Sequence, residues 1–297
     1  METHCTNQLV KKQLFKQHID YAEFYVTNHC NITCKNCNRF NNHKISGSAD
    51  WEQFCDTYKE WSKIITVKRI AFLGGEPLLH PNLHIMIGDV RSWWPASEIE
   101  ITTNGLLIER IKPHLQQAII DNSITVYVSI HKESWVEKIK QSVIEKFGAL
   151  ELIESKKVDP VGGHDVFKSH SGIKIILEYT YYFRPTALTY KDNLLVLHNS
   201  NPEAAHKICD MKYSFHFWKG CLYKCGVMVT LPYIIKQRKE LVNISQEQQD
   251  LLNRYKPLTL HRFKKDPWAL DTLLNCIPQC SFCPSSYTGN QEKIFDD

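Results

Sequence analysis

Residues 21–37 read YAEFYVTNHCNITCKNC, an apolar segment that runs directly into three closely spaced cysteines. The aromatic and aliphatic residues of 21–27 predict a β-strand. Cys30, Cys34 and Cys37 follow it with the spacing CxxxCxxC. The cysteine loop is therefore expected at the carboxyl end of a strand, which is where parallel barrels carry their active sites.

Strands and helices are expected to alternate after this loop. The predicted strands lie within 69–77, 98–105, 124–131 and 172–183, and the predicted helices near 48–65, 82–93, 106–119 and 134–149. The polar, glycine-containing residues 158–172 predict a surface loop or lid. This alternation indicates βαβ units, a parallel sheet and an open or closed barrel, so we expect an α/β protein. The alternation of predicted strands and helices stops near residue 200, and the remaining residues are rich in turns and cysteines.

The composition is that of a globular protein, with 43% hydrophobic and 23% charged residues in 297. A formal net charge of +4 does not favour nucleic-acid binding. The sequence has neither the ~18 consecutive apolar residues of a membrane span nor the apolar core of a secretory signal. We therefore expect a cytoplasmic protein with no membrane partner. In that reducing compartment, nine of the eleven cysteines fall in three groups that favour metal binding over disulfides.

The first cysteine group has the residue types of an iron–sulfur site. Three thiolates within eight residues can hold one inorganic cluster, but a [4Fe–4S] cluster usually takes four protein ligands. A three-cysteine loop would leave one iron open to a non-protein ligand. The alternatives are a zinc loop that lacks its fourth ligand and a chance spacing.

A second motif, Gly74-Gly75-Glu76-Pro77, follows the next predicted strand. Its two glycines would let the backbone approach a ligand closely, and a carbonyl could accept a hydrogen bond from an ammonium group. An ordinary turn at a strand end is the alternative. The two motifs together resemble the radical S-adenosylmethionine (SAM) superfamily, in which CxxxCxxC follows the first strand of the barrel and GGEP follows the second.

The resemblance implies a partial (β/α)6 TIM-like barrel over residues 20–200, preceded by an N-terminal arm over 1–19. It implies that Cys30, Cys34 and Cys37 are the catalytic and metal-binding cysteines, holding a [4Fe–4S] cluster whose open iron binds SAM. Gly74, Gly75, Glu76 and Pro77 would hold the methionine part of SAM. The further candidates for cofactor binding lie at or near the ends of later strands: Thr102, Thr103, Asn104, Ser129 and Glu178. For each of these a turn or a structural role is the alternative.

Three other positions bear on the same region. His131 and Arg184 are weaker candidates for contacts with substrate or cofactor. Many members of the superfamily carry an aromatic residue before the third cysteine, against the adenine, whereas this chain has Asn36. Adenine is then expected to pack on Phe40 or against the backbone.

The C-terminal cysteines resemble a SPASM or twitch auxiliary domain over residues 201–297. Cys209, Gly220 and Cys225 fit its opening pattern, in which the glycine turns a hairpin, and Cys280 and Cys283 form a CxxC pair. The resemblance implies a second [4Fe–4S] cluster held by Cys209, Cys225, Cys280 and Cys283. Six cysteines after residue 200 favour the one-cluster twitch form. Cys221 and Cys276 are left as alternative ligands or thiol hydrogen donors, and a structural zinc site is the alternative to a cluster.

The resemblance implies reductive cleavage of SAM to a 5′-deoxyadenosyl radical, with electrons from a donor such as flavodoxin or ferredoxin. That radical would abstract a hydrogen atom from the substrate. The leading hypothesis is a dehydrogenase-like oxidoreductase that oxidises or rearranges a small polar metabolite resembling a sugar or aminocyclitol, with the auxiliary cluster as electron acceptor.

Two other hypotheses remain open. One is a peptide maturase or epimerase, and the other is a non-enzymatic zinc-binding protein. Only 29 residues precede Cys30, fewer than the leader-recognition domain that peptide maturases frequently carry, so the small-molecule hypothesis is favoured.

Overall fold

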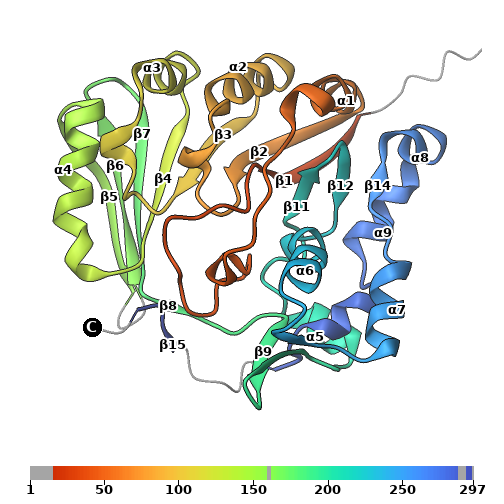
Figure 1. The fold of residues 1–297 in the computed structure, drawn as a ribbon. Coiled ribbons are helices and arrows are strands. Elements are labelled where there is room, and N and C mark those ends of the chain that lie inside the picture. Colours follow the sequence, from red (N-terminus) through yellow and green to blue (C-terminus); the bar gives the residue numbers. More distant parts are fainter. Residues whose placement is uncertain (1–15, 159–161, 287–291, 296–297) are drawn as a thin grey trace, which may run out of the picture.

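The computed structural model describes residues 16–158, 162–286 and 292–295, and its centre is one ten-stranded sheet (Figure 1). The strand order is β14-β12-β11-β1-β2-β3-β4-β7-β6-β5. The parallel strands at its centre are β1 (Gln17–Tyr25), β2 (Ile65–Leu73), β3 (Glu98–Thr103), β4 (Thr125–Ile130) and β7 (Lys174–Thr180). The predicted α/β class with a large parallel sheet is confirmed.

Four helices follow the first four of these strands and lie along one side of the sheet (Figure 1). They are α1 (Trp51–Ile64), α2 (Leu83–Trp93), α3 (Pro113–Asp121) and α4 (Val136–Phe147). Apolar residues at alternate strand positions pack beneath them. Phe24 on β1 is at the centre, with its ring centroid 5.7 Å from that of Phe72 and 4.8 Å from that of Phe217. The intervening residues, such as the buried Glu23 and Glu100, therefore face the opposite side, where the site lies.

Two predicted elements differ from the structure. Helix α3 begins at Pro113 rather than near 106, because proline suits the first turn of a helix; residues 108–110 form a short 3-10 turn instead. The prediction of a surface loop or lid at 158–172 is wrong for the described residues. β5 (Leu150–Val158) and β6 (Gly162–Ser169) form an antiparallel hairpin, and β6 pairs with β7.

Close strand packing explains why this hairpin was mistaken for a loop. A Cβ at Gly162 would lie 1.9 Å from the Tyr179 carbonyl oxygen, and one at Gly163 would lie 2.4 Å from that of Lys156. The glycines that suggested a turn are therefore needed where neighbouring backbones approach closely. The strand–helix alternation accordingly ends at α4. Residues 159–161 lie outside the described part of the chain.

The residues after 200 extend the main sheet as well as forming a smaller helical region. β11 (Phe215–Trp218) pairs in parallel with β1, and β12 (Cys221–Tyr223) returns beside it through Lys219 and Gly220, which both have positive φ. The hairpin predicted at Gly220 is confirmed. β14 (Leu258–Thr259) completes this edge of the sheet. The domain limit at residue 200 remains a prediction.

A second hydrophobic cluster, which includes Val227, Leu231 and Phe282, lies among the other C-terminal elements, whereas Phe263 and Leu273 of this region belong to the main core. The helices are α5 (Pro202–Ile208), α6 (Gly226–Gln237), α7 (Gln246–Arg254), α8 (Leu260–Lys265) and α9 (Asp271–Leu274), followed by the 3-10 helix η6 (Pro278–Phe282). The short strands are β8 (Tyr182–Phe183), β9 (Leu188–Lys191), β10 (Leu194–Leu197), β13 (Val242–Asn243) and β15 (Glu292–Lys293). Among the described residues, no helix combines the length and apolarity that crossing a membrane requires.

Candidate functional site

Cys30, Cys34 and Cys37 lie in a long loop between β1 and α1 whose two ends are held together. The Asn28 amide donates to the Gly47 carbonyl at 2.7 Å, and the Ala49 amide donates to the Val26 carbonyl at 2.8 Å. The intervening residues therefore form a closed loop at the carboxyl edge of the sheet. This is the position that the sequence predicted for the cysteines.

The GGEP segment packs directly against the start of this loop. The Gly75 amide donates to the Thr27 carbonyl at 2.6 Å, and the Glu76 amide donates to that of His29 at 2.7 Å. A Cβ at Gly74 would lie 2.4 Å from the Thr27 carbonyl oxygen, and one at Gly75 would lie 2.1 Å from the His29 carbonyl oxygen. The glycines thus permit contact between two backbones, which places the residues before Cys30.

Glu76 lies behind this contact and joins the ends of two strands. It is fully buried, and its carboxyl group accepts from the Thr103 hydroxyl at 2.7 Å, the Asn104 amide at 2.9 Å and the Leu78 amide at 3.0 Å. Burial raises its pKa to about 7 despite these hydrogen bonds. The Asn104 side chain in turn donates to Asn31 Oδ1 at 2.7 Å, so Glu76 positions Asn104, which itself contacts the cysteine loop.

A cavity of about 210 Å³ lies between the cysteine loop and the ends of the strands. Nine of the predicted residues line it: Cys30, Cys34, Cys37, Gly74, Gly75, Thr102, Thr103, Asn104 and Ser129. Three others do not: Glu76 and Pro77 lie behind it, and Glu178 lies on β7 with its carboxylate 3.9 Å from His164 Nδ1. The structure therefore gathers most, but not all, of the predicted residues around one space.

The same cavity has lining residues that sequence reasoning missed or weighted lightly. Arg39 and Asn41 were missed because neither belongs to a recognisable motif, whereas Phe183 belongs to an aromatic segment that the sequence offered as a possible lining of the substrate pocket. His131 also lines it, packed 5.2 Å from the Phe183 ring, and burial lowers its pKa, which favours a neutral imidazole. Phe40, by contrast, is buried in the second hydrophobic cluster and does not line the cavity.

Two observations test whether these residues fit a SAM-binding iron–sulfur cluster. Burial raises the pKa of the Cys30 thiol to about 12 and also raises that of Cys34, so these thiols need a metal to become thiolates. In addition, Asn41 is 4% exposed and its Oδ1 is buried without a hydrogen-bond partner, although its amide donates to the Asn28 carbonyl. A three-thiol donor set beside an unsatisfied acceptor fits a cluster together with a ligand that carries N–H groups.

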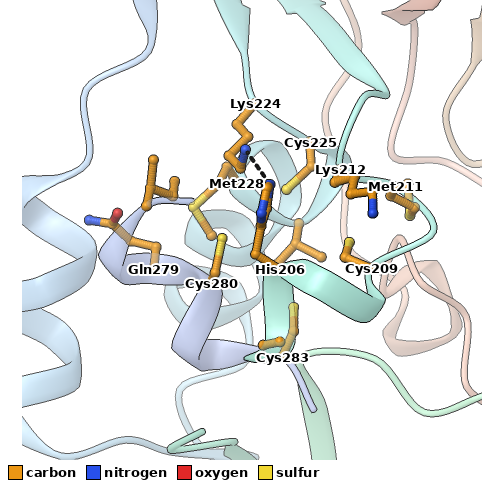
Figure 2. A pocket seen from close by; sticks show the side chains of 13 residues that line it. His206, Cys209, Met211, Lys212, Lys224, Cys225, Met228, Gln279, Cys280 and Cys283 are labelled. Atoms are coloured by element: carbon orange, nitrogen blue, oxygen red, sulfur yellow. Dashed lines mark hydrogen bonds between the residues drawn. The ribbon is translucent and has the colours of Figure 1, made fainter. Parts of the chain in front are cut away.

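The C-terminal segment forms a second site with four cysteines (Figure 2). Cys209 follows α5, Cys225 immediately precedes α6, and Cys280 and Cys283 belong to η6 and its end. The four predicted auxiliary ligands line one cavity, whereas Cys221 and Cys276 do not line it. Cys276 lies close enough to Cys280 to contribute to the raised pKa of that thiol, for which burial is the main cause. No group of three or more His, Cys, Asp or Glu side chains in the described ranges could hold a single metal ion.

Lys224 is a buried cation within this second site. Its ammonium group donates to the Leu273 carbonyl at 2.6 Å and to the Asn275 carbonyl at 2.7 Å, and it lies 3.4 Å from His206 Nε2 (Figure 2). Burial lowers the pKa of Lys224, and the neighbouring cysteines oppose that change. Lys224 directly precedes Cys225, and its hydrogen bonds therefore tie that cysteine to the segment that precedes Cys276. Four thiols around a cation suit an anionic cluster.

A third cavity of about 420 Å³ lies between the two sites. Asn36 and Asn38, which flank Cys37, line it, and so do Cys209, Cys225 and Cys283 of the C-terminal site. Its other lining residues include both aromatic and charged side chains, namely Tyr182, Phe183, Arg184 and Asp210. One space is thus shared by both cysteine-bearing segments.

Curated relatives match part of the chain. It is 31% identical over 127 residues to a GTP 3′,8-cyclase from Chlorobaculum tepidum, a match that covers 41% of this chain and 36% of the relative. It is 33% identical over 107 residues to molybdenum cofactor biosynthesis protein 1 from Dictyostelium discoideum, covering 35% of this chain and 17% of that protein. The chain therefore spans less than half the length of either relative. No family model matches it.

Among solved structures, BtrN in complex with AdoMet and 2-DOIA matches at 25% identity and a TM-score of 0.31, covering 39% of this chain and 48% of BtrN. At such a TM-score the likeness carries no inference about this chain. The relatives in sequence, together with the CxxxCxxC and GGEP motifs, support a radical SAM enzyme. The superfamily's cofactors, SAM and a [4Fe–4S] cluster, are the groups expected in the first site.

Proposed function

We propose that this radical SAM enzyme acts on a small polar molecule held in the 420 Å³ cavity between two iron–sulfur clusters. The observation that supports the proposal most is that this one cavity is lined by the residues beside Cys37 and by three C-terminal cysteines. Its volume is in the range of small-molecule sites. Asn36, Asn38, Arg184 and Asp210 offer polar contacts for a substrate such as a sugar or an aminocyclitol.

The residues of the first site have distinct roles in this proposal. Cys30, Cys34 and Cys37 hold the cluster, and Gly74 and Gly75 place the loop before it. Thr102, Thr103, Asn104 and Ser129 line the space in which SAM would bind, and Asn41 Oδ1 would be available to accept a hydrogen bond from it. When bound, the cluster and SAM supply the ability to remove a hydrogen atom from an unactivated C–H bond.

In this proposal, the residues of the second site hold the group that accepts an electron from the substrate radical. Cys209, Cys225, Cys280 and Cys283 hold an auxiliary cluster, which supplies an electron acceptor when bound. Three of these cysteines also line the substrate cavity, so the acceptor would lie next to the substrate. The net reaction proposed is a dehydrogenase-like two-electron oxidation, with a flavodoxin or ferredoxin as the external electron donor.

A nucleotide is the second candidate substrate. The sequence relatives are named GTP 3′,8-cyclase, and Arg184 lines the cavity with a guanidinium group that suits phosphate recognition. A peptide substrate, as in a maturase or epimerase, and a zinc-binding protein without enzymatic activity remain as outcomes that the experiment distinguishes.

The test begins with anaerobic purification and metal analysis. We expect about eight irons per chain and no stoichiometric zinc. Reduced enzyme with SAM should form 5′-deoxyadenosine, and the Cys30/Cys34/Cys37→Ala triple variant should form none. Products are then sought by mass spectrometry with aminocyclitols, GTP and candidate peptides. Colourless protein that carries zinc would overturn the proposal, and modification of peptides alone would replace its substrate class.

A further inference from the structure

A buried cluster of charged side chains joins the first cysteine loop to the C-terminal segment. Arg39, two residues after Cys37, donates to Glu23 Oε2 on β1 at 2.6 Å and hydrogen-bonds to His216 Nε2 on β11. The exposed fractions of Arg39, Glu23 and His216 are 4%, 3% and 0%. The three residues come from three segments, and β11 belongs to the chain beyond residue 200.

The electrostatics of this cluster are balanced internally. Burial by itself would raise the pKa of Glu23, but Arg39 and His216 together lower it below its usual value. Burial is also the main cause of a lowered pKa at His216, whose Nδ1 lies 2.8 Å from the Ser214 carbonyl. That contact turns Nε2 toward Arg39 and Glu23. The cluster is therefore ordered from all sides and has little freedom to rearrange.

Gly226 extends the network to the second cysteine site. It follows Cys225 directly and is the first residue of α6. A Cβ at position 226 would lie 1.5 Å from Arg39 Nη1 and 3.0 Å from His216 Nε2. The Arg39 guanidinium thus occupies the space that a side chain at 226 would need. Arg39 also lines the cavity that contains Cys30, Cys34 and Cys37.

We propose that Arg39 is a positioning residue that couples the two cysteine sites. Its backbone fixes it to Cys37, its guanidinium contacts the residue after Cys225, and Glu23 and His216 hold that guanidinium in place. A displacement at position 226 is then transmitted to the Cys37 segment and changes the surroundings of the first cluster. The coupling rests on the proposed function, because its readout assumes that the first site holds a cluster that binds SAM.

The test is a double-mutant cycle of Arg39→Ala, Gly226→Ala and their combination, with Gly88→Ala as the matched control. Gly88 lies on α2, and nothing lies within 4 Å of a Cβ placed there. The first readout is the electron paramagnetic resonance spectrum of the reduced first cluster, recorded in a Cys280/Cys283→Ala background so that the second cluster does not contribute. The second is the dissociation constant of SAM by equilibrium dialysis. The third is the midpoint of thermal unfolding of the apoprotein.

Gly226→Ala is expected to shift the spectrum of the first cluster and to weaken SAM binding about tenfold, the loss of roughly one good hydrogen bond. In the Arg39→Ala background, Gly226→Ala should cause no further change in the spectrum or in SAM affinity, because the Arg39 guanidinium no longer occupies the space of the new Cβ. Gly88→Ala should match the parent. His216→Gln, which keeps an uncharged side chain on β11, serves as the milder variant and should shift the same spectrum if the alanine variants fail to fold.

Two results would overturn the coupling. One is a first cluster whose spectrum and SAM affinity are unchanged by Gly226→Ala and His216→Gln. The other is a set of changes in which the effects of Arg39→Ala and Gly226→Ala simply add. Absence of iron from the wild-type protein is a different result, which contradicts the proposed function itself and is read before any variant is made.

Discussion

Glu76 makes the stability of the fold fall with rising pH across the neutral range. Its carboxyl group is fully buried, and burial raises its pKa from 4.5 to about 7. Because the folded pKa lies above the unfolded value, the protonated form is favoured in the folded protein. The resulting stabilisation is complete below pH 4.5 and is lost as the pH rises through about 7. Each pH unit between these values corresponds to about 1.4 kcal/mol, so the full loss is about 3 kcal/mol.

The comparison that isolates this contribution is Glu76→Gln, measured by denaturant unfolding of the apoprotein from pH 5 to pH 8. Glutamine does not titrate, but its NH2 group would face the Asn104 amide, which costs about 1–3 kcal/mol at every pH. The free energy of unfolding of the wild type minus that of the variant should therefore fall by about 2–3 kcal/mol over this range. Glu145→Gln, at an exposed position, is the control: the free energy of unfolding of the wild type minus that of this variant should not change with pH. A Glu76 difference that stays constant, or that grows with pH, would show that burial does not govern this carboxyl group.

Three further predictions concern the two sites. Gly75→Ala should lower the free energy of unfolding by about 2–3 kcal/mol in denaturant titrations, because its Cβ would lie 2.1 Å from the His29 carbonyl oxygen. Gly88→Ala is the control and should leave the free energy of unfolding unchanged, since nothing lies within 4 Å of a Cβ placed there. Equal effects of the two changes would contradict the close packing of Gly75 against the cysteine loop. Lys224→Met should lose the hydrogen bonds to Leu273 and Asn275 and reduce iron from about eight to about four per chain, and retention of all the iron would show that this cation does not support the second site. Cys280→Ser should cause the same loss while Cys221→Ser keeps the iron, since Cys280 lines the cavity and Cys221 does not; the reverse result would reassign the ligands.

The sequence predicted the parts of the structure in which the local pattern and the tertiary environment agree. The strands before Cys30 and Gly74 are apolar runs that become central parallel strands, and the helix expected near 48–65 is α1, which the Asp50 carboxylate caps. The hairpin of β5 and β6 was missed because Gly162 and Gly163 indicate a turn by composition, whereas here they allow close contact between strands. A residue pattern alone does not distinguish these two uses of glycine.

The candidate site shows the same limit at long range. The spacing of Cys30, Cys34 and Cys37 is local, so it could be read directly from the chain. Arg39 could not be found in this way, because its partner His216 lies 177 residues further along the sequence. Glu76 was predicted to help hold SAM as part of the GGEP motif, and that role stays a prediction; the inward hydrogen bonds of its carboxyl group to Thr103 and Asn104 could not be read from the motif.

The most direct test of the central claim is electron paramagnetic resonance of the first cluster alone, in the anaerobically reconstituted Cys280/Cys283→Ala variant. We expect about four irons per chain and, after reduction, a signal whose g-values shift when SAM is added, because SAM binds the iron that no cysteine occupies. A protein without a reducible cluster, or a signal that SAM leaves unchanged because a fourth side chain completes the coordination, would contradict the account.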